Sequence, residues 1–294
     1  MASRKNDTGS TSPCVAKPSR PGQTVAMKHA TVAAFALVAA GSWSVPAHSS
    51  STDWFEAQGG RIRLVTTGMP DAQGRLKGIL DIHLDTGWKT YWRDPGDAGV
   101  PPSLNLTGST NVSGAEVSFP APQRHDDGYS LWAGYDRSLA LPITFHIASP
   151  DKPAVISADV FLGICEAICI PVHANFTLDP ASAPDDPADA TSVARAIQAL
   201  PMAARSDFGA TIVGQDDKTL LVAAALPFGA SSAELFLAGD DGYVFAAPKR
   251  NEKNGKTVFS VEVLDRPALN PAAGGLHYTL VTDRGAVSGI LPYP

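Results

Sequence analysis

Two stretches of alternating apolar and polar residues flank a pair of cysteines, and they strongly constrain how this chain can fold. Strict alternation is typical of a β-strand with one buried face. We therefore expect two half-buried strands, one before the cysteines and one after them. Apolar side chains occupy the even positions of both strands: Ile156, Ala158, Val160 and Leu162 before the pair, and Ile170, Val172, Ala174, Phe176 and Leu178 after it.

The two cysteines, Cys165 and Cys169, lie between these strands in the segment GICEAICIP at 163–171. Along one extended strand, residues four apart are separated by roughly 13 Å, whereas a disulfide needs Cα atoms within about 7 Å. A disulfide would therefore require the chain to reverse at 166–168, in a tight hairpin. Because both cysteines occupy odd positions, we expect them on the face away from the core, where a partner can reach them.

The residues alone leave three interpretations of the pair open: a structural disulfide, a redox-active pair and a metal site. On a helix, Cys165, Cys169 and His173 would lie along one stripe, an arrangement suited to copper(I) or zinc. Pro171 and the alternation after it argue against a helix. The C-x3-C spacing on its own favours the structural disulfide over the other two.

The composition predicts a boundary between domains after the second strand. The segment DPASAPDDPADAT at 179–191 is rich in Pro, Ala and Asp, a composition typical of a linker. Directly after it, Val193, Ile197 and Leu200 recur at helical spacing and Pro201 follows as a stop. This pattern predicts one short amphipathic helix.

Most of the remaining chain consists of short apolar stretches punctuated by Gly, Pro, Asn and Asp, which is typical of β-sandwiches. The 247 residues after position 47 suit one large domain or two ordinary ones. We expect an all-β fold of two tandem β-sandwich domains, at 48–180 and 208–294, joined by a linker and a short helix at 181–207.

The N-terminal region has the layout of a secretory signal peptide. Residues 27–47 read MKHATVAAFALVAAGSWSVPA, with a basic start at Lys28, an apolar stretch and small residues at the end. We expect this leader, residues 1–47, to be removed together with Cys14. The alternative is a retained N-terminal membrane anchor. Removal predicts an exported, periplasmic protein in an oxidising compartment, where a disulfide can persist.

The charge balance excludes two classes of partner. Residues 1–47 hold five of the 23 basic residues and one of the 29 acidic residues, so the formal net charge would change from −6 to about −10 on their removal. A surface this acidic repels phosphate backbones and anionic lipid, so we expect no nucleic-acid partner. No segment after residue 47 offers 18 consecutive apolar residues, so no membrane span is expected in the mature chain.

Four segments of the chain carry a family resemblance. They are DTGWKTYWRDPGDAGVPPSL (85–104), FPAPQRHDDGY (119–129), LALPITF (139–145) and FLGICEAICIPVHANFTL (161–178). Together they resemble the N-terminal periplasmic region of thiol:disulfide interchange proteins of the DsbD type, and most closely the subgroup associated with suppression of copper sensitivity. The resemblance covers most of residues 54–180 and extends more weakly to 294.

The resemblance implies an immunoglobulin-like first sandwich in which Cys165 and Cys169 are the redox pair. In that family the pair takes electrons from a membrane-embedded domain and passes them to periplasmic proteins, and in one branch an aromatic cap shields it. The counterparts of the cap in this chain would be Tyr129, Trp132 and Tyr135. Three residues separate the two cysteines in this chain, whereas five separate them in that branch. The chain therefore departs from the pattern of the branch in which the cap is found.

The family's membrane electron carrier and thioredoxin-like domain have no counterpart before the chain stops at Pro294. We therefore expect partners of two kinds, thioredoxin-like periplasmic proteins and a separate membrane electron carrier, and no cofactor. No Lys, Arg or His lies within three residues of either cysteine, whereas Glu166 adjoins Cys165 and disfavours its thiolate.

Two functions remain open at this point. The first is a thiol:disulfide interchange module, a possible oxidoreductase component, in which the pair cycles between disulfide and dithiol. The second is a non-catalytic exported binding protein, with copper as the candidate ligand, in which the pair is a permanent disulfide or a set of metal ligands.

Overall fold

The computed structural model describes residues 50–96, 99–126, 128, 130–184, 186–216, 218–240, 242–253, 255–267 and 274–293. The expected leader and signal peptide at 1–47, with Cys14, lie outside the described residues, and so does Tyr129. No helix in the described ranges is long and apolar enough to cross a membrane.

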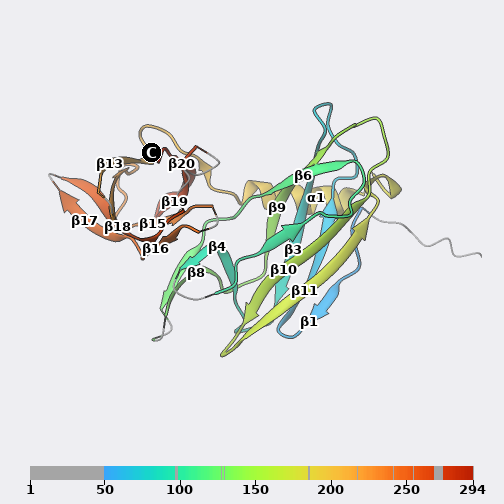
Figure 1. Cartoon of the computed structure of the whole chain (residues 1–294), viewed down its shortest axis with the longest axis horizontal. Helices are drawn as coiled ribbons and strands as arrows, with labels where there is room; N and C mark the ends of the chain where they lie inside the picture. The colour runs from blue at the N-terminus through green and yellow to red at the C-terminus, as the bar shows by residue number, and fades with distance from the viewer. Residues whose placement is uncertain are drawn as a thin grey trace, which may run out of the picture. The chain divides into compact units, whose positions relative to one another are not determined.

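Two antiparallel sheets enclose the first hydrophobic core (Figure 1). The larger sheet has the strand order β1-β2-β3-β9-β6, and the smaller one has the order β11-β10-β5. The strands of the larger sheet are β1 (Phe55–Ala57), β2 (Gly60–Thr66), β3 (Arg75–Leu84), β6 (Val112–Val117) and β9 (Leu139–Ile147). Those of the smaller sheet are β5 (Ser103–Asn105), β10 (Ile156–Cys165) and β11 (Cys169–Leu178).

The alternation around the cysteines determines which face of β10 and β11 is buried. The even positions of β10, from Ile156 to Ile164, lie in the core between the two sheets, together with Val172, Ala174 and Phe176 of β11. The expected pair of half-buried strands is therefore confirmed. Ile170 is only partly buried, and it lies at the turn end of the hairpin, next to Cys169.

One helix, α1 (Pro187–Gln198), packs against the outer face of the larger sheet. Val193 and Ala196 of the helix contact Val65 and Ile79, which point away from the first core. Ile197, which the helical spacing placed on the buried stripe, is exposed because Ala196 takes that place. A 3-10 turn, η1 (Pro180–Ser182), precedes the helix.

The start of α1 corrects the expected extent of the linker. The Pro- and Asp-rich composition at 179–191 predicted a linker, but the helix begins inside that segment. Asp186 is its N-cap, and its carboxylate accepts hydrogen bonds from the backbone N–H groups of Ala188 and Asp189. Asp at the N-cap followed by Pro187 at the first helical position is a helix-start signal. Composition alone did not distinguish this signal from a linker.

A small third sheet lies beside the smaller sheet of the first sandwich. Its strand order is β4-β8-β7, and β4 also contacts β10. Successive side chains of a strand point to opposite faces, so Tyr91 and Trp92 of β4 lie in two different clusters. The bounds are β4 (Thr90–Gly96), β7 (Gln123–Asp126) and β8 (Leu131–Tyr135).

The C-terminal part of the chain encloses a second hydrophobic core between two further sheets (Figure 1). The all-β fold of tandem sandwiches is thus confirmed. One sheet, in the order β12-β20-β19-β15, contains β12 (Met202–Ala203), β15 (Ala233–Ala238), β19 (Leu276–Thr282) and β20 (Gly285–Leu291). The other contains β13 (Gly209–Gln215), β14 (Thr219–Ala225), β16 (Val244–Phe245) and β18 (Lys256–Asp265), with β17 (Lys249–Lys253) also paired to β18.

Candidate functional site

The cysteine pair closes the hairpin formed by β10 and β11. The two strands pair antiparallel from Ile156 with Leu178 to Cys165 with Cys169, and the chain reverses over residues 166–168. The cysteines form a disulfide with a Cα–Cα distance of 4.1 Å. The expected hairpin is therefore confirmed, and the alternative of a helix through this segment is wrong.

The two sulfur atoms of the disulfide lie in different environments. Both cysteines are on the face of the hairpin away from the sandwich core, as their odd positions predicted. Cys169 is exposed, however, whereas only 1% of Cys165 is accessible to solvent. The expectation that a partner can reach both cysteines is wrong for Cys165, because the small sheet covers it. An incoming thiol can therefore approach the disulfide from the side of Cys169.

Two aromatic side chains of the small sheet form the cover. Tyr91 and Trp132 are buried in one cluster with Cys165, and their rings meet edge to face with centroids 5.7 Å apart. The Tyr91 hydroxyl lies 3.0 Å from Cys169 Sγ. A tyrosine and a tryptophan thus bury one sulfur, and the tyrosine also contacts the other.

Two glycines make room for the ring of Tyr91. A Cβ atom added to Gly163 of β10 would lie 3.3 Å from the ring and 3.1 Å from Val100 Cβ. One added to Gly99 would lie 2.6 Å from the ring, closer than real Cβ contacts allow. The hydroxyl of Thr90 also donates a buried hydrogen bond of 2.8 Å to the Gly163 carbonyl, which holds β4 against β10.

Polar side chains surround Trp132. His125 of β7 stacks on its ring with a centroid distance of 4.0 Å, and the Lys89 ammonium lies 4.4 Å from the ring centroid. Burial lowers the pKa of His125, and the positive charge of Lys89 adds to this effect, whereas the negative charges of Asp136 and Glu234 oppose it. A neutral His125 is the form that suits a position beside a cation.

The structure places the three expected cap residues differently from one another. Trp132 covers Cys165, as described above. Tyr135 lies on the opposite face of the small sheet, among Trp92 and Phe236, and its hydroxyl donates a hydrogen bond to the Pro120 carbonyl. Tyr129 lies outside the described residues. Tyr91, which the sequence motif contained but which was not singled out as a cap, takes the position next to the disulfide.

His173, the third residue of the alternative metal site, lies apart from the cysteines. It pairs with Phe161 across the hairpin, and the two rings are 4.3 Å apart. Four residues of strand, roughly 13 Å, separate it from Cys169. Within the described part of the chain, no three or more His, Cys, Asp and Glu side chains come together in a way that could hold a metal ion.

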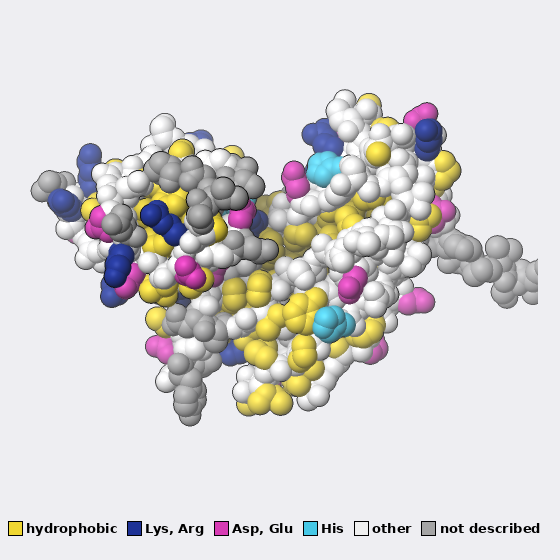
Figure 2. All heavy atoms as spheres, viewed as in Figure 1, with side chains coloured by type: hydrophobic (Ala, Val, Ile, Leu, Met, Phe, Trp, Pro, Cys, Tyr) yellow, Lys and Arg dark blue, Asp and Glu magenta, His cyan; other side chains and the backbone are white. Residues whose placement is uncertain are grey.

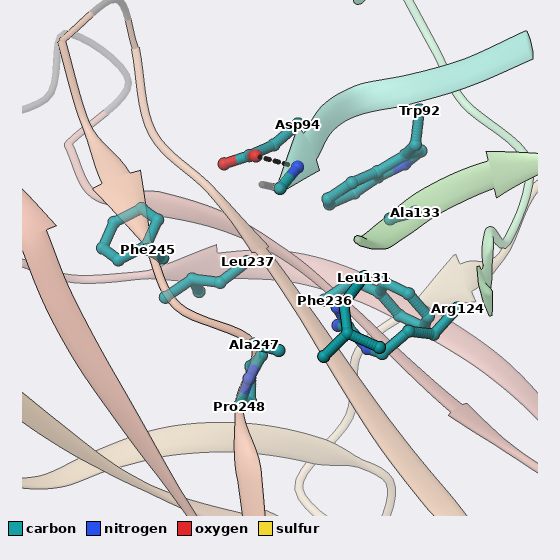
Figure 3. A pocket seen from close by; sticks show the side chains of 11 residues that line it. Trp92, Asp94, Arg124, Leu131, Ala133, Phe236, Leu237, Phe245, Ala247 and Pro248 are labelled. Atoms are coloured by element: carbon teal, nitrogen blue, oxygen red, sulfur yellow. Dashed lines mark hydrogen bonds between the residues drawn. The ribbon is translucent and has the colours of Figure 1, made fainter. Parts of the chain in front are cut away.

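The far face of the small sheet contacts the second sandwich. Trp92 meets Phe236 of β15 edge to face at 5.9 Å, and Arg124 donates a hydrogen bond of 3.2 Å to the Leu235 carbonyl. Figure 3 shows the pocket of about 20 Å³ at this contact, with the carboxylate of Asp94 bonded to the backbone N–H of Gly96. Burial raises the pKa of Asp94. The small sheet therefore lies between the disulfide on one side and the second sandwich on the other.

The surface next to Cys169 is apolar. Ile168 at the tip of the hairpin is 68% exposed, Pro171 is exposed and Phe161 is partly exposed. Figure 2 shows hydrophobic side chains gathered over β10 and β11. The reachable sulfur thus lies beside side chains that a protein partner can bury.

Residues 65–181 match the family model for the N-terminal domain of the thiol:disulfide interchange protein DsbD, so this segment is similar to a DsbD-type N-terminal domain. The matched segment contains both cysteines, both strands of the hairpin and the small sheet. The resemblance predicted from the sequence is confirmed.

Solved structures extend the comparison beyond this segment. The N-terminal periplasmic domain of ScsB from Proteus mirabilis matches with a TM-score of 0.65 at 21% identity, and the match covers 84% of this chain and 100% of that chain. It shows that the two share a fold. The yeast GGA1 GAE domain matches 44% of this chain and 97% of its own at 9% identity, with a TM-score of 0.25 that carries no argument. The comparison with curated protein sequences finds no match.

Proposed function

We propose that this chain is a thiol:disulfide interchange module in which Cys165 and Cys169 cycle between disulfide and dithiol. The observation that carries the proposal is the asymmetry of the disulfide: one cysteine is exposed at the end of the hairpin turn, and the other is buried under aromatic rings. The match of residues 65–181 to the DsbD N-terminal family supports the same chemistry.

The exchange begins at the exposed sulfur. A partner thiolate attacks Cys169 Sγ, a new S–S bond forms between the partner and Cys169, and the bond between the two cysteines breaks. The electron pair of that bond remains on Cys165 as a thiolate. A second thiolate of the partner then attacks the partner's own sulfur in the mixed disulfide and releases Cys169. Two electrons pass to this chain, the partner becomes a disulfide, and the two thiolates of the chain take protons from water.

The reverse sequence of steps passes the electrons on. Cys169 attacks an oxidised partner, and Cys165 then attacks Cys169 in the mixed disulfide to restore the internal bond. Thioredoxin-like periplasmic proteins and a separate membrane electron carrier are the partners that this role requires. The apolar surface formed by Ile168 and Pro171 is the proposed docking surface for them, because it borders Cys169.

Export and domain organisation complete the proposal. Removal of residues 1–47 in transit would deliver residues 48–294 to the periplasm, where disulfide exchange takes place. We assign the redox pair to a first domain at 48–180, and a second domain at 208–294 follows a linker and helix at 181–207. The intact mass of the protein recovered from a periplasmic fraction tests the removal, since a retained leader would add the mass of residues 1–47.

Trapping of the mixed disulfide tests the proposed function. In a Cys165→Ser variant, Cys169 can still form the mixed disulfide with a partner, but Cys165 can no longer resolve it. We expect this variant to accumulate a covalent complex with a purified thioredoxin-like protein supplied in its oxidised form. The Cys169→Ser variant should form far less of it, because Cys165 is buried. If neither variant forms the complex, and the wild-type pair remains oxidised in the presence of a reduced thioredoxin-like protein, the pair is a permanent disulfide.

A further inference from the structure

A lysine that is distant in the sequence lies directly opposite the buried cysteine. The backbone N–H of Lys89 donates to the Cys165 carbonyl over 2.8 Å, and the N–H of Cys165 donates to the Lys89 carbonyl over 2.9 Å. Residues that exchange both hydrogen bonds in this way have Cα atoms about 5.5 Å apart and side chains on the same face. The side chains of Lys89 and Cys165 are therefore neighbours on the face that Tyr91 and Trp132 cover.

The charged end of Lys89 is held close to this face. Its ammonium lies 4.4 Å from the ring centroid of Trp132, and Trp132 is buried in the same cluster as Cys165. A cation over an indole ring is attracted to it. Lys89 is partly buried, and the interaction of its charge with a neighbouring charge is therefore stronger than in bulk water.

We propose that Lys89 stabilises the Cys165 thiolate that is released when a partner attacks Cys169. This inference rests on the proposed function and deepens it. A leaving thiol with a lower pKa departs faster in disulfide exchange, and a lysine beside a thiol lowers its pKa. The ammonium thus favours the step in which the bond between the cysteines breaks, and it takes no part in the bond that forms at Cys169.

The other charged and titratable groups around Cys165 are compatible with this role. Glu166 follows Cys165 in the sequence, but it is exposed on the turn, where solvent screens its charge. Tyr91 contacts Cys169 Sγ through a neutral hydroxyl. His125 lies behind Trp132, and burial favours its neutral form. Among these groups, Lys89 supplies the positive charge.

Two substitutions of Lys89 test the inference in the full chain. Lys89→Met removes the charge and keeps an apolar stem over Trp132, whereas Lys89→Arg keeps the charge. We expect Lys89→Met to slow reduction of the disulfide by dithiothreitol at pH 7 by about three- to tenfold, and Lys89→Arg to restore most of the rate. Lys249→Met, which removes an exposed lysine on β17, is the matched control and should react like the wild type.

A second measurement distinguishes the charge from a structural effect. In a background that carries both Cys14→Ser and Cys169→Ser, the pH dependence of the thiolate ultraviolet absorbance reports the pKa of Cys165. Lys89→Met should raise this pKa and Lys89→Arg should not, while both keep the wild-type circular dichroism spectrum. Equal reduction rates and equal pKa values in wild type and a folded Lys89→Met would overturn the inference and leave the proposed function standing. A wild-type disulfide that dithiothreitol and a reduced thioredoxin-like protein both leave intact would overturn the proposed function itself.

Discussion

The Tyr91 hydroxyl donates a hydrogen bond to Cys169 Sγ across 3.0 Å. Because a sulfur atom in a disulfide carries no proton, the hydroxyl is the donor. The same tyrosine is 97% buried in the cluster that covers Cys165, so one side chain contacts both halves of the pair. Access to the disulfide therefore depends on where this ring lies.

Removal of the Tyr91 ring should make the disulfide easier to reach. We expect Tyr91→Ala to speed reduction by a small thiol such as glutathione by about tenfold or more, since access limits thiol–disulfide exchange. Tyr91→Phe keeps the ring and loses only the hydroxyl, so its rate should remain within about threefold of the wild type. Reduction rates measured at identical thiol concentrations test whether the ring limits access to the disulfide. Equal rates for Tyr91→Ala and wild type would show that the ring is no barrier.

The absence of a side chain at Gly163 should be required for this cover. We expect Gly163→Val to destabilise the fold by about 1–3 kcal/mol, because the added atoms would crowd Val100 and the Tyr91 ring. Gly114 of β6 is the matched control, since nothing lies within 4 Å of a Cβ added there. Gly114→Val should change the free energy of unfolding little, because valine is otherwise favoured in strands. Urea unfolding measures both, and equal stability of the two variants would contradict the packing argument.

Ionisation of Asp94 should cost stability at neutral pH. Burial raises its pKa above the ordinary value of 3.8, against the opposing effects of its hydrogen bond from Gly96 and the charge of Arg124. The folded state therefore favours the protonated carboxyl, and this contribution is complete below pH 3.8 and is lost as pH rises through the raised pKa. The Asp94→Asn variant has no carboxyl group to ionise at this position, so it does not lose this stability as pH rises.

Thermal unfolding as a function of pH tests this contribution. Asp94→Asn should have a higher Tm than the wild type at pH 7, and the difference should disappear at acidic pH below 3.8. Asp85→Asn is the control for the loss of one carboxylate, because Asp85 is exposed directly after β3. A wild type more stable than Asp94→Asn at pH 7 would mean that the attraction to Arg124 outweighs the cost of burial.

The local pattern around the cysteines predicted the hairpin well because strand alternation is a short-range signal. The even positions 156–164 of β10 and 172–176 of β11 lie in the core, and the turn falls between Cys165 and Cys169. The same logic failed at 179–191, where proline and aspartate were taken as marks of a linker although Asp186 and Pro187 begin a helix. Composition cannot separate a helix start from a loop when the cap residue is also a common loop residue.

The surroundings of the disulfide could not be predicted because they come from distant segments. The absence of basic residues within three positions of either cysteine suggested a site without positive charge, yet an isolated β-bridge just before β4 brings Lys89 next to Cys165 of β10. Alternation within the segment KTYW would have placed Lys89 and Tyr91 on one face and Trp92 on the other. Only the pairing of the strands reveals which of these faces meets the disulfide.

The reduction potential of the pair tests the central claim most directly. Equilibration of the full chain with defined ratios of reduced and oxidised glutathione or dithiothreitol, followed by alkylation of free thiols and mass measurement, gives the potential of the Cys165–Cys169 couple. A module that exchanges with thioredoxin-like partners should have a potential above about −300 mV, where such partners can reduce it. A potential well below about −300 mV would mark an inert structural bond and would contradict the account.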